Sequence, residues 1–111
     1  MESLTEVVTR TADAAELHAP VPTLLLELQS LLGRLTVTVT EATDRGRRPF
    51  RPTADWSDRL GELVYGVYLL ADQSGVDVDA AVRSTAANVQ HRLQRAAQQA
   101  QPQSDWPFGS E

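Results

Sequence analysis

Residues 58–82 read DRLGELVYGVYLLADQSGVDVDAAV, and this stretch decides the fold. Its first apolar residues repeat at the three- and four-residue spacing of one helix face. They are Leu60, Leu63, Val64, Val67, Leu70 and Ala71. Gly75 is typical of the residue after a helix, and Asp77 of the residue that caps the next one. The stretch therefore predicts two helices joined by a short turn, with Asp55 or Ser57 capping the first.

Two further helices are predicted upstream. Residues 4–17 carry one apolar stripe, and residues 24–35 carry a second, after a stop and restart at Pro20 and Pro22. Residues 35–40, LTVTVT, alternate with the period of a β-strand. We still predict a helix there, because an isolated strand would have no partner in this chain. The helical stripe also continues through it, at Leu28, Leu32, Leu35 and Val39.

The last predicted helix follows Asp77, carries a stripe of Val, Ala and Leu, and fades near residue 100 into a polar tail. The pattern as a whole predicts an all-α protein, a four-helix bundle over residues 1–100 with a flexible or docking tail at residues 101–111. The stripes on the middle two helices are wide for so short a chain. We therefore expect a dimer or a higher homo-oligomer.

The composition excludes several kinds of chemistry. The chain has 111 residues, no cysteine, and ten basic residues that are all arginine. A thiol nucleophile, a cysteine-based zinc site and a Schiff-base lysine are therefore absent. The net charge of −5 argues against broad nucleic-acid binding. No signal peptide or membrane span is recognisable, so we expect a cytoplasmic protein that does not enter membranes.

Two segments resemble a known family. LLADQSGVDVDAAV (69–82) resembles the helix–turn–helix that closes MazG-type, all-α nucleoside triphosphate pyrophosphohydrolases, and LHAPVPTLLLELQSLLGRL (17–35) is similar to the matching piece of dCTP pyrophosphatases. The resemblance spans roughly residues 15–92. It implies an all-α dimer or tetramer and magnesium-dependent cleavage of a nucleotide into a monophosphate and pyrophosphate. It also implies two facing pairs of acids, Glu-x-x-Glu and Glu-x-x-Asp, that hold the Mg²⁺.

This chain departs from that acid pattern. Leu31 and Arg34 stand where the first pair is expected, and Arg59 and Glu62 where the second is expected. The Lys and Asn expected on the last helix align with Thr85 and Val89. One carboxylate in place of four cannot build the family's metal cage, and arginines repel Mg²⁺.

Two interpretations of the remaining acids stay open. A rebuilt magnesium site would use Glu27, Asp58 and Glu62. In the alternative, which we prefer, Asp58 interacts favourably with the positive N-terminal end of its helix, and Glu62 pairs with Arg34 or Arg59.

Four arginines crowd the loop over residues 44–55 and are candidates for phosphate binding, since arginine forks suit phosphate. They are Arg45, Arg47, Arg48 and Arg51. Trp106 and Phe108 stand in the polar tail and are candidates for docking a partner.

Three other residues are weighed for a role. Neither His18 nor His91 has an acid cluster expected around it, and His18 is expected to line the entry to the second helix. Tyr65 either stacks a base or packs in the core, and we favour packing.

These features leave three hypotheses. The first is a MazG-like bundle without its metal site that binds a nucleotide or a protein as a regulatory module. The second is an active, magnesium-dependent pyrophosphohydrolase with a rearranged site. The third is a scaffold that recruits a partner through its WPF tail.

Overall fold

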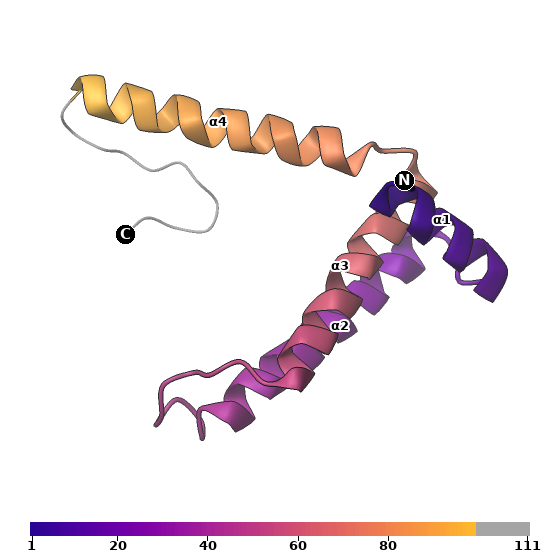
Figure 1. Ribbon diagram of the computed structural model, residues 1–111, viewed down its shortest axis with the longest axis horizontal. Helices are drawn as coiled ribbons and strands as arrows, with labels where there is room; N and C mark the ends of the chain where they lie inside the picture. The colour runs from indigo at the N-terminus through magenta and orange to yellow at the C-terminus, as the bar shows by residue number, and fades with distance from the viewer. Residues whose placement is uncertain (100–111) are drawn as a thin grey trace. The chain divides into compact units, whose positions relative to one another are not determined.

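A computed structural model describes residues 1–99; residues 100–111 lie outside the described part. Residues 1–99 form four α-helices and no strand, which confirms the predicted all-α class (Figure 1). The helices are α1 (Leu4–Ala15), α2 (Val21–Ala42), α3 (Ala54–Ser74) and α4 (Val78–Gln99). The chain divides into two compact units, Met1–Val76 with the first three helices and Asp77–Glu111 with the fourth.

Helix α1 is closed at both ends by local contacts. The Ser3 hydroxyl accepts a hydrogen bond from the Glu6 backbone N–H, and the Glu6 carboxylate accepts one from the Ser3 backbone N–H. This reciprocal pair satisfies two donors that every helix N-terminus leaves unpaired. Glu16 ends the helix in the left-handed conformation, with φ of 56°.

Helix α2 continues without a break through the alternating LTVTVT stretch, which confirms the helix prediction there. Each threonine hydroxyl in the stretch donates back to a carbonyl of the preceding turn: Thr36 to Leu32, Thr38 to Leu35 and Thr40 to Thr36. The hydroxyls thus find partners within the helix, so the β-branched residues are accommodated without a second strand.

Helix α3 begins two residues earlier than a cap at Asp55 would give, and four earlier than a cap at Ser57. Thr53 is its N-cap, and the Thr53 hydroxyl accepts from the Trp56 backbone N–H, so the prediction of Asp55 or Ser57 as the cap is wrong. Asp55 instead lies in the first turn, where its negative charge interacts favourably with the positive end of the helix dipole. At the other end Gly75 adopts φ of 73°, and the predicted C-terminal glycine is confirmed.

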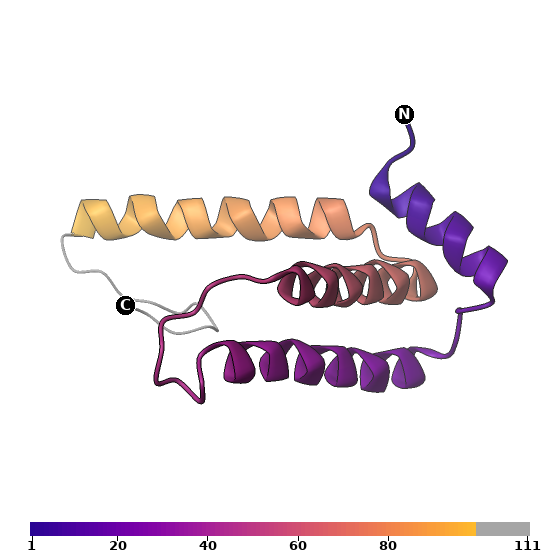
Figure 2. The same cartoon turned by 60° about the horizontal axis from the view of Figure 1, so that its bottom comes forward.

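Helices α2 and α3 form an antiparallel hairpin, side by side in both views (Figures 1 and 2). Gly66 permits the close approach, because a Cβ there would lie 2.9 Å from Leu28 Cδ2 and 3.1 Å from Leu31 Cδ1. Helix α1 packs on α3 near one end of the hairpin. The core is small: within the described residues, Val8, Ala12, Leu24 and Leu69 form one buried cluster, and Leu35 and Ala71 are buried outside it.

Helix α4 belongs to the second unit and begins as predicted, since the Asp77 carboxylate accepts a hydrogen bond from the Ala80 backbone N–H. None of its side chains is buried, and Val82 and Leu93 on the predicted stripe are 61% and 67% exposed. Over residues 1–99, no helix combines the length and the apolar character that crossing a bilayer demands.

Candidate functional site

Glu62, the one acid that the sequence resemblance placed at an expected metal position, is bound by arginines. Arg59 Nη1 lies 2.8 Å and 2.9 Å from the two carboxylate oxygens of Glu62, and Arg34 Nη1 lies 3.7 Å from one of them. The hydrogen bonds that Arg59 donates to Glu62, with further contributions from nearby acids, raise the pKa of Arg59. The preferred interpretation of Glu62, pairing with Arg34 or Arg59, is confirmed for both partners.

The other two acids of the candidate metal site lie at separate levels of the hairpin. Arg34 on α2 contacts Glu62 on α3, so these two residues lie at the same height along the hairpin axis. Glu27 lies seven residues from Arg34, or about 10 Å along α2, towards the end that meets α1. Asp58 lies about 6 Å along α3 from Glu62, in the opposite direction. The described residues contain no group of three His, Cys, Asp or Glu side chains that could hold a metal ion. A metal role for the three acids stays a prediction.

The structure corrects the expectation for His18. Its Nε2 lies 2.7 Å from Asp72 on α3, and its Nδ1 lies 3.2 Å from Asp13 on α1. Thr9 also donates to Asp72, at 2.9 Å. The expectation that no acids surround His18 is wrong, because the fold brings Asp72 next to it from 54 residues away in the sequence. We call these four side chains the His18 network.

Tyr65 is part of the same helix contact. Its hydroxyl lies 2.7 Å from the Thr11 hydroxyl, and its ring packs against the buried core. The interpretation of Tyr65 as a packed residue is confirmed. His91, by contrast, is exposed on α4 beside a shallow hollow that Asn88, Arg92 and Arg95 also line.

The four candidate phosphate ligands all lie in the loop that joins α2 to α3, which we call the arginine loop (residues 44–51). All four are exposed, and among the described residues only the Arg47 side chain has a partner, Asp44 at 3.8 Å. The loop is anchored by Thr43, a buried residue that sequence reasoning missed. Its hydroxyl donates to the Val39 carbonyl at 2.7 Å and accepts from the Gly46 backbone N–H at 3.0 Å. A threonine three residues before a glycine, just past a helix, is the only signal that could have indicated it.

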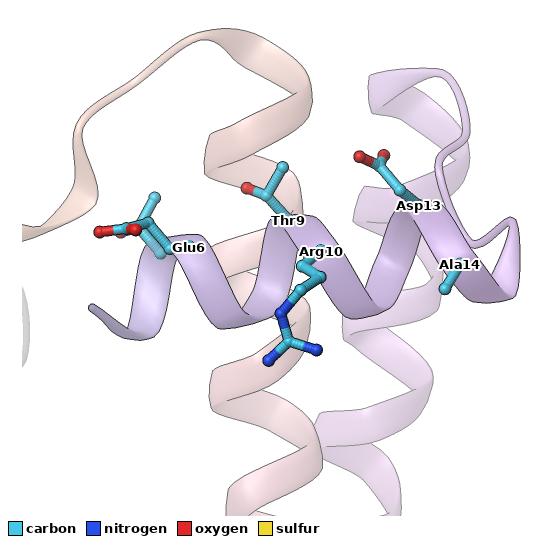
Figure 3. Close-up of a pocket in the computed structure, with 6 residues that line it drawn as sticks. Glu6, Thr9, Arg10, Asp13 and Ala14 are labelled. Atoms are coloured by element: carbon cyan, nitrogen blue, oxygen red, sulfur yellow. The ribbon is translucent and has the colours of Figure 1, made fainter. Parts of the chain in front are cut away.

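Concave surface is present on the unit formed by α1, α2 and α3. A cavity of about 280 Å³ lies between the α1–α2 linker, α2 and α3; it is lined by leucines, with His18, Glu16 and Glu27 among the polar residues. An open hollow also lies along α1 (Figure 3). All of its polar side chains except Thr5 have a partner within the described residues: Glu6 with Ser3, Arg10 with Glu2, Thr9 with Asp72 and Asp13 with His18. The hollow therefore has little left with which to bind a ligand.

Exposed apolar residues form a stripe on each of the two hairpin helices, and we call the two stripes together the apolar face. It consists of Leu25 and Leu32 on α2 with Leu60, Val64 and Val67 on α3. Their spacing of seven on α2, and of four and three on α3, places each set on one side of its helix. Sequence reasoning predicted these residues as a stripe and expected part of it to be buried between copies.

Trp106 and Phe108, the candidate docking residues of the tail, lie outside the described residues. Comparison of the chain with models of protein families, with curated proteins and with solved structures finds no match. The resemblance to MazG-type pyrophosphohydrolases therefore stays a prediction from the two sequence segments.

Proposed function

We propose that this chain is a non-catalytic, MazG-like helical module that works by binding, and that it associates with a second copy of itself through the apolar face. The observation that carries the proposal is the exposure of this face. Leu25 and Leu32 are 49% and 53% exposed, and Val64 is 43% exposed. Exposed apolar residues that gather on one side of a helix, unlike those scattered singly, mark an interaction site.

The apolar face points away from α1. Helix α1 contacts α3 through Tyr65 and Asp72. At 100° per residue, the centre of the Leu60–Val64–Val67 stripe lies about 120° around α3 from that contact. A second copy can therefore reach the face without displacing α1.

The charge pattern favours a second copy as the occupant. The positions that continue the two stripes carry no charge: they are Gln29, Thr36 and Val39 on α2, and Trp56, Leu63 and Leu70 on α3. In a two-fold dimer the same patch of both copies is in contact, so any charge on it would lie close to the same charge on the other copy. A chain of net charge −5 that keeps this face uncharged avoids that repulsion.

The arginine contacts of Glu62 support a role without catalysis. A carboxylate that ligates Mg²⁺ must present its oxygens to the ion. Both oxygens of Glu62 already accept from Arg59, and Arg34 adds a second positive charge nearby. Binding of a cation at this position would require both arginines to move away.

Sedimentation velocity of the full chain tests the proposal. We expect a species of twice the 12.2 kDa chain mass. Val64→Glu and Leu32→Glu should shift it to the monomer, because each places a charge on the apolar face. Leu26→Glu is the matched control, since Leu26 is a 64% exposed leucine about 100° around α2 from Leu25. Circular dichroism establishes that each variant is helical. A wild-type monomer at all concentrations, or an equal effect of Leu26→Glu, contradicts the proposal.

A further inference from the structure

The arginine loop concentrates positive charge in a chain that is otherwise acidic. Residues 44–51 hold four of the ten arginines and one of the fifteen acids, a net charge of +3. The remaining residues hold six arginines and fourteen acids, a net charge of −8. The side chains of Arg45, Arg48 and Arg51 have no hydrogen-bond or ion-pair partner within residues 1–99. Their guanidinium groups are therefore available to an external anion.

The backbone of the loop is ordered in an unusual conformation. Asp44, Arg45 and Gly46 follow one another with φ of 50°, 60° and 86°. Two of these are not glycine, and such a conformation persists only where surrounding contacts impose it. The contacts are visible: the Arg45 N–H donates to the Thr40 carbonyl, and the Arg48 N–H donates to the Thr43 carbonyl, each at 2.8 Å.

Both ends of the loop are fixed to the hairpin. The Thr43 hydroxyl ties Gly46 to the end of α2. At the other end the ring of Phe50 packs edge-on against Trp56 of α3, with centroids 4.9 Å apart. A loop held in this way loses less conformational freedom when it binds than a free loop does.

We infer that the arginine loop is a preformed site for the phosphate chain of a small polyphosphate ligand. Arginine presents paired N–H donors that match phosphate oxygens. Of the acids near the loop, Asp44 lies 3.8 Å from Arg47, and Asp55 and Asp58 are close enough to Arg59 to contribute to its raised pKa. This site is separate from the apolar face, and the inference does not depend on self-association.

The charge distribution selects a small ligand over a long polyanion. At physiological salt, charges further apart than about 8 Å are largely screened from each other. A short phosphate chain within the loop therefore experiences mainly the arginines. A long nucleic acid would also pass the acidic remainder of the chain, which opposes binding.

Titration of the full chain with sodium tripolyphosphate, followed by calorimetry, tests the inference. We expect saturable binding that weakens about tenfold or more in Arg45→Gln/Arg48→Gln, since each arginine contributes charge-assisted hydrogen bonds. The matched control is Arg83→Gln/Arg95→Gln on α4, which makes the same change in net charge and should alter binding by less than about twofold. No saturable binding, or an equal loss in the control, overturns the inference.

A second pair of variants tests whether the loop is preformed. Thr43→Val keeps every arginine and the net charge but removes the hydroxyl that holds Gly46, so we expect weaker binding with unchanged helix content. Thr43→Ser keeps the hydroxyl and should bind like the wild type. Wild-type binding by Thr43→Val overturns the preformed site. A titration with ATP in place of tripolyphosphate shows which part of a ligand the loop recognises. Tighter binding of ATP indicates that the ligand is a nucleotide, and equal binding indicates that the phosphate chain alone is recognised. Both outcomes support the site.

Discussion

At the scale of single residues, the His18 network holds α1 to the hairpin. Only the imidazolium form of His18 can donate to both carboxylates, since a neutral ring has one N–H. The hydrogen bond from His18, and after it that from Thr9, lowers the pKa of Asp72. Sequence reasoning could not find this network, because the proximity of residues 18 and 72 arises only from the packing of α1 on α3.

The lowered pKa of Asp72 gives stability a defined dependence on pH. The folded protein binds the Asp72 proton less readily than the unfolded chain does, so the network stabilises the fold above the unfolded pKa of about 3.9. That contribution is lost as the pH falls below this value through the folded pKa. We expect Asp72→Asn to lower the free energy of unfolding by roughly 1 kcal/mol at neutral pH. The free energy of unfolding of this variant should also fall less steeply as the pH is lowered; we call this acidic part of the curve its acid limb.

Urea denaturation at a series of pH values, at one protein concentration, measures both effects. Glu27→Gln is the control, because Glu27 is an exposed acid outside the network. An acid limb that is as steep in Asp72→Asn as in the wild type contradicts this assignment.

At the scale of elements, the spacing of apolar residues predicted where the helices lie, but it did not predict which of those residues are buried. The stripe from Leu24 to Leu35 and the continuation through LTVTVT predicted α2 correctly. The residues that are buried on it, Leu24 and Leu35, were on the predicted stripe, whereas Leu25 and Leu32 on the same stripe are exposed. A period in the sequence reports which residues share a side of a helix. It does not report how many neighbours cover that side.

The helical glycines provide a test of the α2–α3 contact. Gly33 and Gly61 would place a Cβ with no atom within 4 Å, so we expect alanine at either position to raise the free energy of unfolding by about 0.5–1 kcal/mol. At Gly66 the same gain is offset, because the new Cβ presses on Leu28 and Leu31. Alanine there should be nearly neutral, and Gly66→Val should cost about 1–3 kcal/mol. Thermal and urea unfolding of the four variants measure these differences. An equal gain from alanine at all three positions would mean that the helices lie further apart.

At the scale of the whole molecule, the candidate sites occupy different parts of the hairpin. The arginine loop lies at the far end from α1, and the His18 network lies where α1 meets α3 (Figure 1). The sequence located the four arginines and Glu62 as candidates, because charge density and helical register are local properties. It could not supply the partners of Glu62 on two helices, since the distance from Arg34 depends on how α2 and α3 align.

This arrangement predicts that the molecule does not hydrolyse nucleotides. Cleavage between phosphates requires cations that bridge the phosphate oxygens, held by carboxylates. Glu62 is paired with two arginines, and Glu27 and Asp58 lie at other levels of the hairpin. We therefore expect no pyrophosphate release from any canonical NTP or dNTP with Mg²⁺ or Mn²⁺, measured on protein shown to be helical. Glu62→Ala is compared with Glu41→Ala, an exposed acid elsewhere on α2. The wild type could instead show turnover that persists in Glu41→Ala and disappears in Glu62→Ala. That result would establish that the arginines release Glu62 so that it can bind a metal ion. The module would then be an enzyme with a rearranged site.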